Sequence, residues 1–165
     1  MIDELKNIEY VLFDLDGTVS DSSEGITKSA DKALKSEGID VPFETLTSFI
    51  GPALRVSFGR YTDDVEKRDR MLDVYRERYS EKGWCENKIY PGMAELLRDL
   101  QKSGKHVVLA SAKPEYFCRK IIKYFGVEQY FDFIGGSDME GKRDDKTVLL
   151  TYVLDNIGNP PSDKI

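Results

Sequence analysis

The sequence predicts an α/β protein in which a helical segment is inserted into a parallel-sheet domain. Two observations indicate this class. After about residue 90, short apolar runs alternate with helical patterns, which is typical of parallel strands joined by helices. Between the first apolar run and that alternation, residues 18–87 show only helical spacing of apolar side chains. We therefore expect a core domain formed by residues 1–17 and 88–165 and a helical domain formed by residues 18–87.

The first strand and the first helix are both marked by the residues that end them. Ile8–Phe13 is an apolar run that stops at Asp14, as expected of a buried strand followed by a loop. From Ser22 to about Glu37 apolar residues recur at helical spacing, and Gly38 follows as a stop signal. The acidic residues after the first strand are thus expected at its C-terminal end.

The remaining elements follow from the same signals. Two short helices are expected on either side of Gly51-Pro52, and a longer, highly charged helix over residues 62–82. The core domain is then expected to continue with a helix at 93–102, a strand at 107–110, a helix at 114–125, a strand at 131–134 and a helix at 145–157.

Composition excludes several classes of protein. With 165 residues, 40% of them hydrophobic and 33% charged, the chain is long enough for a packed core and too apolar for disorder. The net charge of −6 argues against nucleic-acid and membrane partners, because such surfaces need excess Lys and Arg. The two cysteines lack a metal-binding spacing, and no window resembles a membrane span or a signal peptide. We expect a cytoplasmic protein.

Two carboxylates lie where an α/β sheet binds its ligands. Ligands of open α/β sheets bind beyond the C-terminal ends of the strands, and Asp14 and Asp16 directly follow the first strand. One carboxylate can attack phosphorus and carry the phosphoryl group, and a second can protonate the leaving alkoxide. Gly17 permits a tight turn after them. The alternative is an acidic turn without a catalytic role.

Polar residues also follow the other two strands. Ser111 comes directly after residues 107–110, where its hydroxyl could bind a phosphoryl oxygen beside a helix N-terminus. It could equally be the capping residue of that helix. Lys142 and Lys146 both follow the strand at 131–134. Either could neutralise a phosphoryl group, and either could be an ordinary surface lysine.

In this order, the features resemble the haloacid dehalogenase-like hydrolase superfamily, and within it the phosphoglycolate phosphatase and 5′-nucleotidase branch. The resemblance covers essentially the whole chain. It rests on Phe13-Asp14-Leu15-Asp16-Gly17-Thr18, Asp21-Ser22, Phe49-Ile50-Gly51-Pro52-Ala53-Leu54, Tyr90-Pro91-Gly92, Ser111-Ala112-Lys113-Pro114 and the lysine of Arg143-Asp144-Asp145-Lys146. It implies a Rossmann-like parallel-sheet core with an inserted all-helical cap. The implied activity is hydrolysis of a small phosphorylated metabolite, phosphoglycolate or a nucleoside monophosphate, through an aspartyl-phosphate.

The resemblance also implies roles for single residues. Asp14 would be the nucleophile and Asp16 the general acid and base. Mg²⁺ would be held by the Asp14 carboxylate and the Asp16 backbone carbonyl. Apart from the resemblance, Arg55 is a candidate to bind the non-reacting end of the substrate. It follows Gly51-Pro52-Ala53-Leu54 in the insert, and a guanidinium suits a carboxylate or a second phosphate, although Arg55 could also be an exposed helix residue. The implied phosphate-binding residues are Ser111, Lys146, Thr18 and Ala112.

One part of the family pattern is not found in this sequence. The fourth motif, an acidic pair that completes the Mg²⁺ shell, would follow Ser162-Asp163-Lys164-Ile165, where the sequence ends. We therefore expect a fragment with an incomplete metal site and little activity, in which the first strand has an open edge that favours association. A monomer or a homodimer is expected. A phosphomutase and a non-catalytic phospho-ligand binding protein remain as alternative functions.

Overall fold

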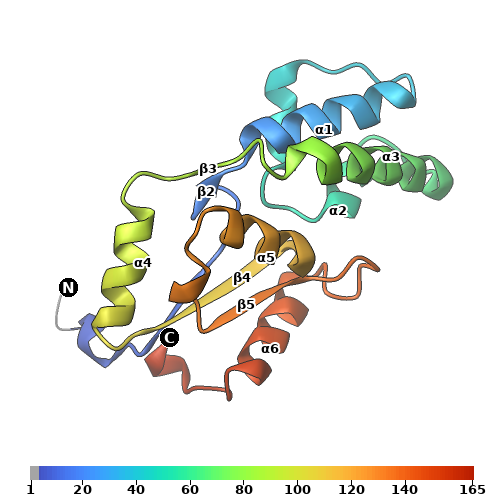
Figure 1. Ribbon diagram of the computed structural model, residues 1–165. Helices are drawn as coiled ribbons and strands as arrows, with labels where there is room; N and C mark the ends of the chain where they lie inside the picture. The colour runs from blue at the N-terminus through green and yellow to red at the C-terminus, as the bar shows by residue number, and fades with distance from the viewer. Residues whose placement is uncertain (1–3) are drawn as a thin grey trace. The chain divides into compact units, whose positions relative to one another are not determined.

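The computed structural model describes residues 4–165, which form two compact units. One unit comprises the chain up to Val19 together with Ile89–Ile165, and the other comprises Ser20–Lys88. Figure 1 shows the elements in chain order. Within the described part of the chain, no helix has both the length and the apolar character needed to cross a membrane.

The first unit is built on a three-stranded parallel sheet. Its strands lie in the order β1-β4-β5, so that β4 is central. Leu109 of β4 is in register with Phe13 on one side and with Ile134 on the other. This confirms the parallel α/β core that the sequence predicts. The strands are β1 (Tyr10–Phe13), β4 (His106–Pro114) and β5 (Phe133–Ser137).

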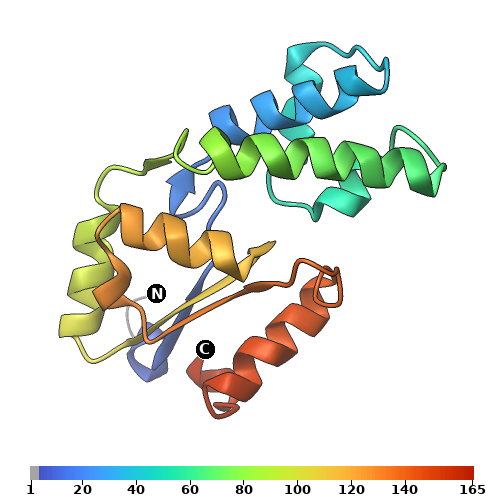
Figure 2. The same cartoon turned by 45° about the vertical axis from the view of Figure 1, so that its right-hand side comes forward.

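Helices cover both faces of this sheet, as parallel strands require because each connection must cross from one end to the other. Val108 and Ala110 of β4 pack against Leu149 and Val153 of α6. Figure 2 shows α5 on one side of the sheet and α6 on the other. The helices are α4 (Met93–Lys102), α5 (Glu115–Tyr124) and α6 (Lys146–Asn156), with short turns η1 (Glu4–Asn7), η4 (Glu128–Tyr130) and η5 (Ser162–Lys164).

Two strands are longer than the sequence predicts. β4 continues beyond the expected end at residue 110, so Ser111 lies inside the strand. β5 continues through Gly135 and Gly136, where glycine suggested a loop. A Cβ at Gly135 would lie 2.6 Å from Val153 Cγ2, and one at Gly136 would lie 2.5 Å from the Lys113 carbonyl oxygen. The glycines thus permit close packing within a strand rather than ending it.

The second unit is helical, in agreement with the inserted segment that the sequence predicts. Helices α1 and α3 run side by side (Figure 1). Helix α1 and the π-helical turn that follows α3 approach closely at Gly25 and Gly83, since a Cβ at Gly25 would lie 2.0 Å from the Gly83 carbonyl oxygen. The elements are α1 (Ser23–Ser36), the 3-10 segment η2 (Phe43–Phe49), α2 (Leu54–Gly59), α3 (Val65–Arg78) and the π-helical turn η3 (Tyr79–Gly83).

Two short strands mark the ends of the inserted segment. β2 (Ser20–Asp21) and β3 (Lys88–Ile89) pair with each other as a two-stranded sheet. No strand is expected here from the sequence, and two residues are too few to give a periodic pattern. The residues between these two strands remain helical, with connecting loops.

Candidate active site

Asp14 lies at the C-terminal end of β1, and both oxygens of its carboxylate have partners. Oδ1 accepts a hydrogen bond from the backbone N–H of Leu15 at 2.7 Å, and Oδ2 accepts one from Lys146 Nζ at 2.8 Å. The Asp14 side chain is 27% exposed. The carboxylate is therefore held in one orientation and is still accessible to a ligand.

Asp16 lies two residues later, and its surroundings differ from those of Asp14. The tight turn closes with Gly17 at φ +79° and with the N–H of Thr18 donating to the Leu15 carbonyl at 3.3 Å. The Asp16 side chain is only 8% exposed. Its Oδ2 pairs with Lys113 Nζ at 2.9 Å, whereas its Oδ1 is buried and has no hydrogen-bond partner among residues 4–165.

A bulge at the end of β4 places Ser111 and Lys113. Between the paired residues Ser111↔Gly136 and Pro114↔Ser137, β4 advances three positions while β5 advances one. Ser111 is buried, and its hydroxyl accepts a hydrogen bond from the Lys113 N–H at 3.4 Å. The N-cap of α5 is Pro114, so the alternative that Ser111 caps this helix is wrong. Bulges commonly redirect side chains beside functional sites.

Of the two candidate lysines, it is Lys146 that reaches Asp14. Lys146 is the first residue of α6, whose N-cap Asp145 accepts hydrogen bonds from two backbone N–H groups of the first turn. This cap fixes the start of the helix and hence the origin of the lysine side chain. Lys142 pairs instead with Glu140 and is 77% exposed.

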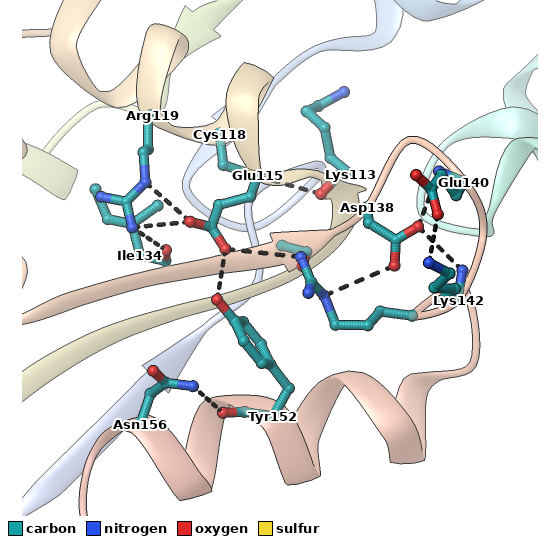
Figure 3. A network of polar contacts seen from close by, with 12 residues as sticks. Lys113, Glu115, Cys118, Arg119, Ile134, Asp138, Glu140, Lys142, Tyr152 and Asn156 are labelled. Atoms are coloured by element: carbon teal, nitrogen blue, oxygen red, sulfur yellow. Dashed lines mark hydrogen bonds and ion pairs between the residues drawn. The ribbon is translucent and has the colours of Figure 1, made fainter.

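The loop that leads into α6 and Lys146 is anchored through Arg143. The Arg143 Nε donates to the Gly136 carbonyl at 3.1 Å, and its guanidinium lies 4.1 Å from the centre of the Tyr152 ring. Glu115 accepts a hydrogen bond from the Tyr152 hydroxyl (Figure 3). This hydrogen bond measures 3.1 Å, and the Glu115 carboxylate also lies 4.0 Å from the Arg143 guanidinium. These contacts connect the loop to β5, α5 and α6.

Asp138 closes the beginning of the same loop. Its Oδ1 accepts hydrogen bonds from the backbone N–H groups of Glu140 and Lys142 at 2.8 and 3.0 Å (Figure 3). Partial burial alone would raise the pKa of Asp138, but these hydrogen bonds favour the charged form and hold the pKa below its ordinary value. The loop is therefore closed by a charged carboxylate at neutral pH.

Three further residues, Thr18, Ala112 and Arg55, are also expected to bind the substrate. Thr18 is exposed in the turn after Asp16, and Ala112 lies partly buried in the β4 bulge. Arg55 belongs to the second unit, at the start of α2, where its Nη1 pairs with Asp69 at 2.9 Å. The roles assigned to these three residues stay predictions.

Lys113 is one of the site residues that the sequence did not reveal. Its pairing partner, Asp16, is almost one hundred positions away in the chain, and no local pattern connects the two. The only available signal was a basic residue two positions after Ser111, next to a predicted strand end. Glu115 and Arg143 were missed for the same reason.

The oxygen donors of Asp14 and Asp16 are of the kind that Mg²⁺ prefers, but they are few. Mg²⁺ requires a near-octahedral shell of oxygen ligands. Among residues 4–165, no three His, Cys, Asp or Glu side chains are grouped so that they could hold a metal ion. The two aspartates therefore supply only part of a Mg²⁺ shell.

These features define an α/β protein with an inserted helical segment and an acidic site at the end of its first strand. The family profile of the haloacid dehalogenase-like hydrolases matches residues 11–163. The chain belongs to this family.

Curated relatives have several names. The chain is 39% identical to a 5′-nucleotidase of Pseudomonas aeruginosa over 90% of its own length and 68% of the relative's. It is 36% identical to the tyrosine-protein kinase PtkA of Mycobacterium tuberculosis, over 88% of its own length and only half of the relative's. It is 30% identical to a phosphoglycolate phosphatase of Aquifex aeolicus, over 93% of its own length and 72% of the relative's.

Solved structures show the same fold. The chain superimposes on the crystal structure of a protein described as a predicted phosphatase from Clostridium acetobutylicum with a TM-score of 0.90 and 41% sequence identity. This similarity covers 95% of the chain and 73% of that protein. The α/β core with an inserted segment is thus the fold of a known group of solved structures.

Proposed function

We propose that this chain carries the catalytic residues of a phosphatase that hydrolyses the monoester of a small metabolite. The observation that carries the proposal is the pair of aspartates at the end of β1, the first of which lies 2.8 Å from the ammonium group of Lys146. Phosphoglycolate and nucleoside monophosphates are the proposed substrates, because relatives are named for activity on these compounds.

In the proposed reaction Asp14 is the nucleophile. Its carboxylate attacks phosphorus, the bond to the ester oxygen breaks, and an aspartyl-phosphate forms. Asp16 gives a proton to the departing alkoxide and later takes one from the water that hydrolyses the intermediate. Water attack returns Asp14 to its free carboxylate and releases inorganic phosphate.

The neighbouring residues would bind the phosphoryl group during this reaction. Lys146 would offset the negative charge that gathers at the phosphoryl oxygens, and the Ser111 hydroxyl would donate a hydrogen bond to one of them. Thr18 and the backbone N–H of Ala112 are proposed as further donors. Arg55 is proposed to bind a carboxylate or second phosphate of the substrate.

Mg²⁺ is the proposed cofactor, as expected for this family, and it would be held by the Asp14 carboxylate and the Asp16 backbone carbonyl. A bound Mg²⁺ would supply electrostatic stabilisation of the phosphoryl oxygens. Because these two residues provide only part of its oxygen shell, the remaining ligands must come from the substrate, from water or from residues beyond these two.

Phosphoryl transfer to an acceptor other than water is the second candidate function. It is favoured by the 36% identity to proteins named tyrosine-protein kinase, and a phosphomutase would use the same pair of aspartates. Binding of a phosphorylated ligand without turnover is a third candidate. Hydrolysis would release inorganic phosphate without any acceptor. Phosphoryl transfer would need an acceptor molecule, and binding alone would give no turnover.

The test is an assay of phosphate release from 2-phosphoglycolate and nucleoside 5′-monophosphates, with Mg²⁺ and without any acceptor. We expect Asp14→Asn to abolish release, because an amide cannot act as the attacking carboxylate, while Asp155→Asn on the outer part of α6 leaves it unchanged. Release that persists in Asp14→Asn would refute the mechanism. Turnover only when a sugar phosphate or protein acceptor is added would favour the second candidate.

A further inference from the structure

Lys113 and Asp16 form a buried ion pair, and the proposed function gives a task to only one of the two. Their side chains are 6% and 8% exposed, and the Lys113 Nζ lies 2.9 Å from the Asp16 Oδ2. Burying two charges costs free energy that their attraction repays only when the remaining polar atoms are also satisfied. The Asp16 Oδ1 is buried, and no group in the described part of the chain forms a hydrogen bond with it. A pair that served stability alone would be expected to satisfy both oxygens.

The main chain of Lys113 is held rigidly in the β4 bulge. A Cβ at Gly136 would lie 2.5 Å from the Lys113 carbonyl oxygen and 2.6 Å from the Glu115 nitrogen, so the bulge rests directly on a glycine of β5. The same carbonyl accepts a hydrogen bond from the Cys118 thiol at 3.4 Å. The lysine side chain therefore starts from a fixed point, which is what a group that orients another side chain requires.

We propose that Lys113 is a positioning residue that holds the Asp16 carboxyl group by its Oδ2, so that Oδ1 is the oxygen that exchanges protons during catalysis. This inference rests on the proposed function. When Asp16 acts as the acid, its proton is carried on Oδ1 and passes to the ester oxygen as the bond of that oxygen to phosphorus breaks and the phosphoryl group joins Asp14. Water then attacks phosphorus, its proton goes to Oδ1, and Asp14 is released from the phosphoryl group. Lys113 keeps its protons throughout.

Two esters with different leaving groups test this role. An alkoxide leaving group needs protonation, whereas p-nitrophenolate is weakly basic and leaves without it. We expect Lys113→Met to lower kcat for 2-phosphoglycolate at least about tenfold more than kcat for p-nitrophenyl phosphate, since acid-base help is worth about 10²–10⁴-fold in rate. Lys123→Met, which removes an exposed lysine of α5, is the matched control and should change neither value.

A double-mutant cycle separates positioning from general damage to the fold. In an Asp16→Asn background, Lys113→Met should have little further effect on kcat for 2-phosphoglycolate, because the group that it orients is already disabled. Lys113→Gln should likewise lower kcat more for 2-phosphoglycolate than for p-nitrophenyl phosphate. It serves in place of Lys113→Met if that variant does not unfold cooperatively in a thermal melt. Lys113→Arg, which keeps the charge, should recover part of the loss.

Two negative results can be told apart. Equal losses on both esters, or a full additional loss in the Asp16→Asn background, would overturn the role of Lys113 and leave the proposed function intact. Absence of Asp14-dependent phosphate release from the wild-type chain would overturn the proposed function, and the positioning role together with it.

Discussion

The two acids after β1 differ in their surroundings in a way that suits different tasks. Asp14 is 27% exposed and meets Lys146, a lysine that is itself 55% exposed. Asp16 is 8% exposed and meets Lys113, which is equally buried. Acids with contrasting environments on one site are the usual basis for dividing nucleophilic and acid-base roles. The exposed acid is the one that a substrate phosphorus could reach.

At the scale of single residues, Lys146→Met tests the cation beside Asp14. We expect kcat to fall about 10²–10³-fold, because one preorganised charge that stabilises a transition state typically contributes that much. Lys142→Met, in the loop before α6, is a matched control. Lys142 is 77% exposed, and within the described part of the chain its side chain forms an ion pair only with Glu140. Steady-state kinetics on 2-phosphoglycolate provide the measurement. Similar losses in both variants would contradict the distinction between the two lysines.

At the scale of elements, the helical unit is held together where the end of α3 and the π-helical turn meet α1. Arg78 of α3 makes two hydrogen bonds to the Glu86 carboxylate, at 2.8 and 3.1 Å, and a third to the Ser29 hydroxyl of α1 at 3.0 Å. Lys28 of α1 lies 3.5 Å from the same carboxylate. Since Gly25 and Gly83 let the main chains approach closely, these charges lie in a partly buried cluster.

This cluster should make the stability of the helical unit depend on pH. The hydrogen bonds from Arg78 hold the pKa of Glu86 below its ordinary value of 4.5, against the opposing effect of burial. A lowered pKa in the folded state means that the stabilisation is present above about pH 4.5 and is lost as the pH falls through the folded-state pKa. Glu86→Gln should therefore lower the free energy of unfolding by about 1 kcal/mol at pH 7, and by progressively less as the pH falls.

Urea unfolding of both proteins at pH 7 and at pH 3 provides the measurement for this element. Glu77→Gln is the control, because the Glu77 side chain is 65% exposed and lies 3.7 Å from Lys32 in a solvated pair. If the free energies of unfolding of wild type and Glu86→Gln differed by the same amount at pH 7 and at pH 3, the Glu86 charge would not stabilise the folded state.

At the scale of the whole molecule, β1 is the edge strand of its sheet, beside an apolar groove. The groove has a volume of about 280 Å³. At the start of the strand, the Glu9 N–H donates to the Lys164 carbonyl at 2.8 Å, and the two side chains form an ion pair of the same length. The groove is lined by Ile8, Val11, Phe13, Leu96, Leu100 and Lys105.

An edge strand next to an apolar groove is a template for association. We expect the 165-residue chain to self-associate as its concentration rises. Val11→Lys should raise the dissociation constant of this association at least about tenfold, because burying an unpaired charge in the interface costs more than the roughly 1.4 kcal/mol that a tenfold change represents. Val148→Lys on α6, a site that is 47% exposed, is the control. Analytical ultracentrifugation over a range of concentrations would show the association. A wild-type chain that stays monomeric throughout would contradict it.

The sequence by itself determined the features that depend on neighbouring residues. Local periodicity placed α4 at Met93–Lys102, with the same bounds that the structure shows. The apolar run before Asp14 located the end of β1, and the alternation of patterns revealed the α/β class with its helical insertion. Such signals are readable because helix and strand periods are properties of a few consecutive residues.

Only the tertiary structure decided which distant residues meet. Lys142 and Lys146 were equivalent candidates in the sequence, and the fold of one loop brings Lys146 to Asp14 across 132 positions of the chain. The extension of β4, its bulge and the buried pair of Lys113 with Asp16 depend on how β5 packs beside β4. Strand register and close packing at Gly136 are long-range properties, and no window of consecutive residues encodes them.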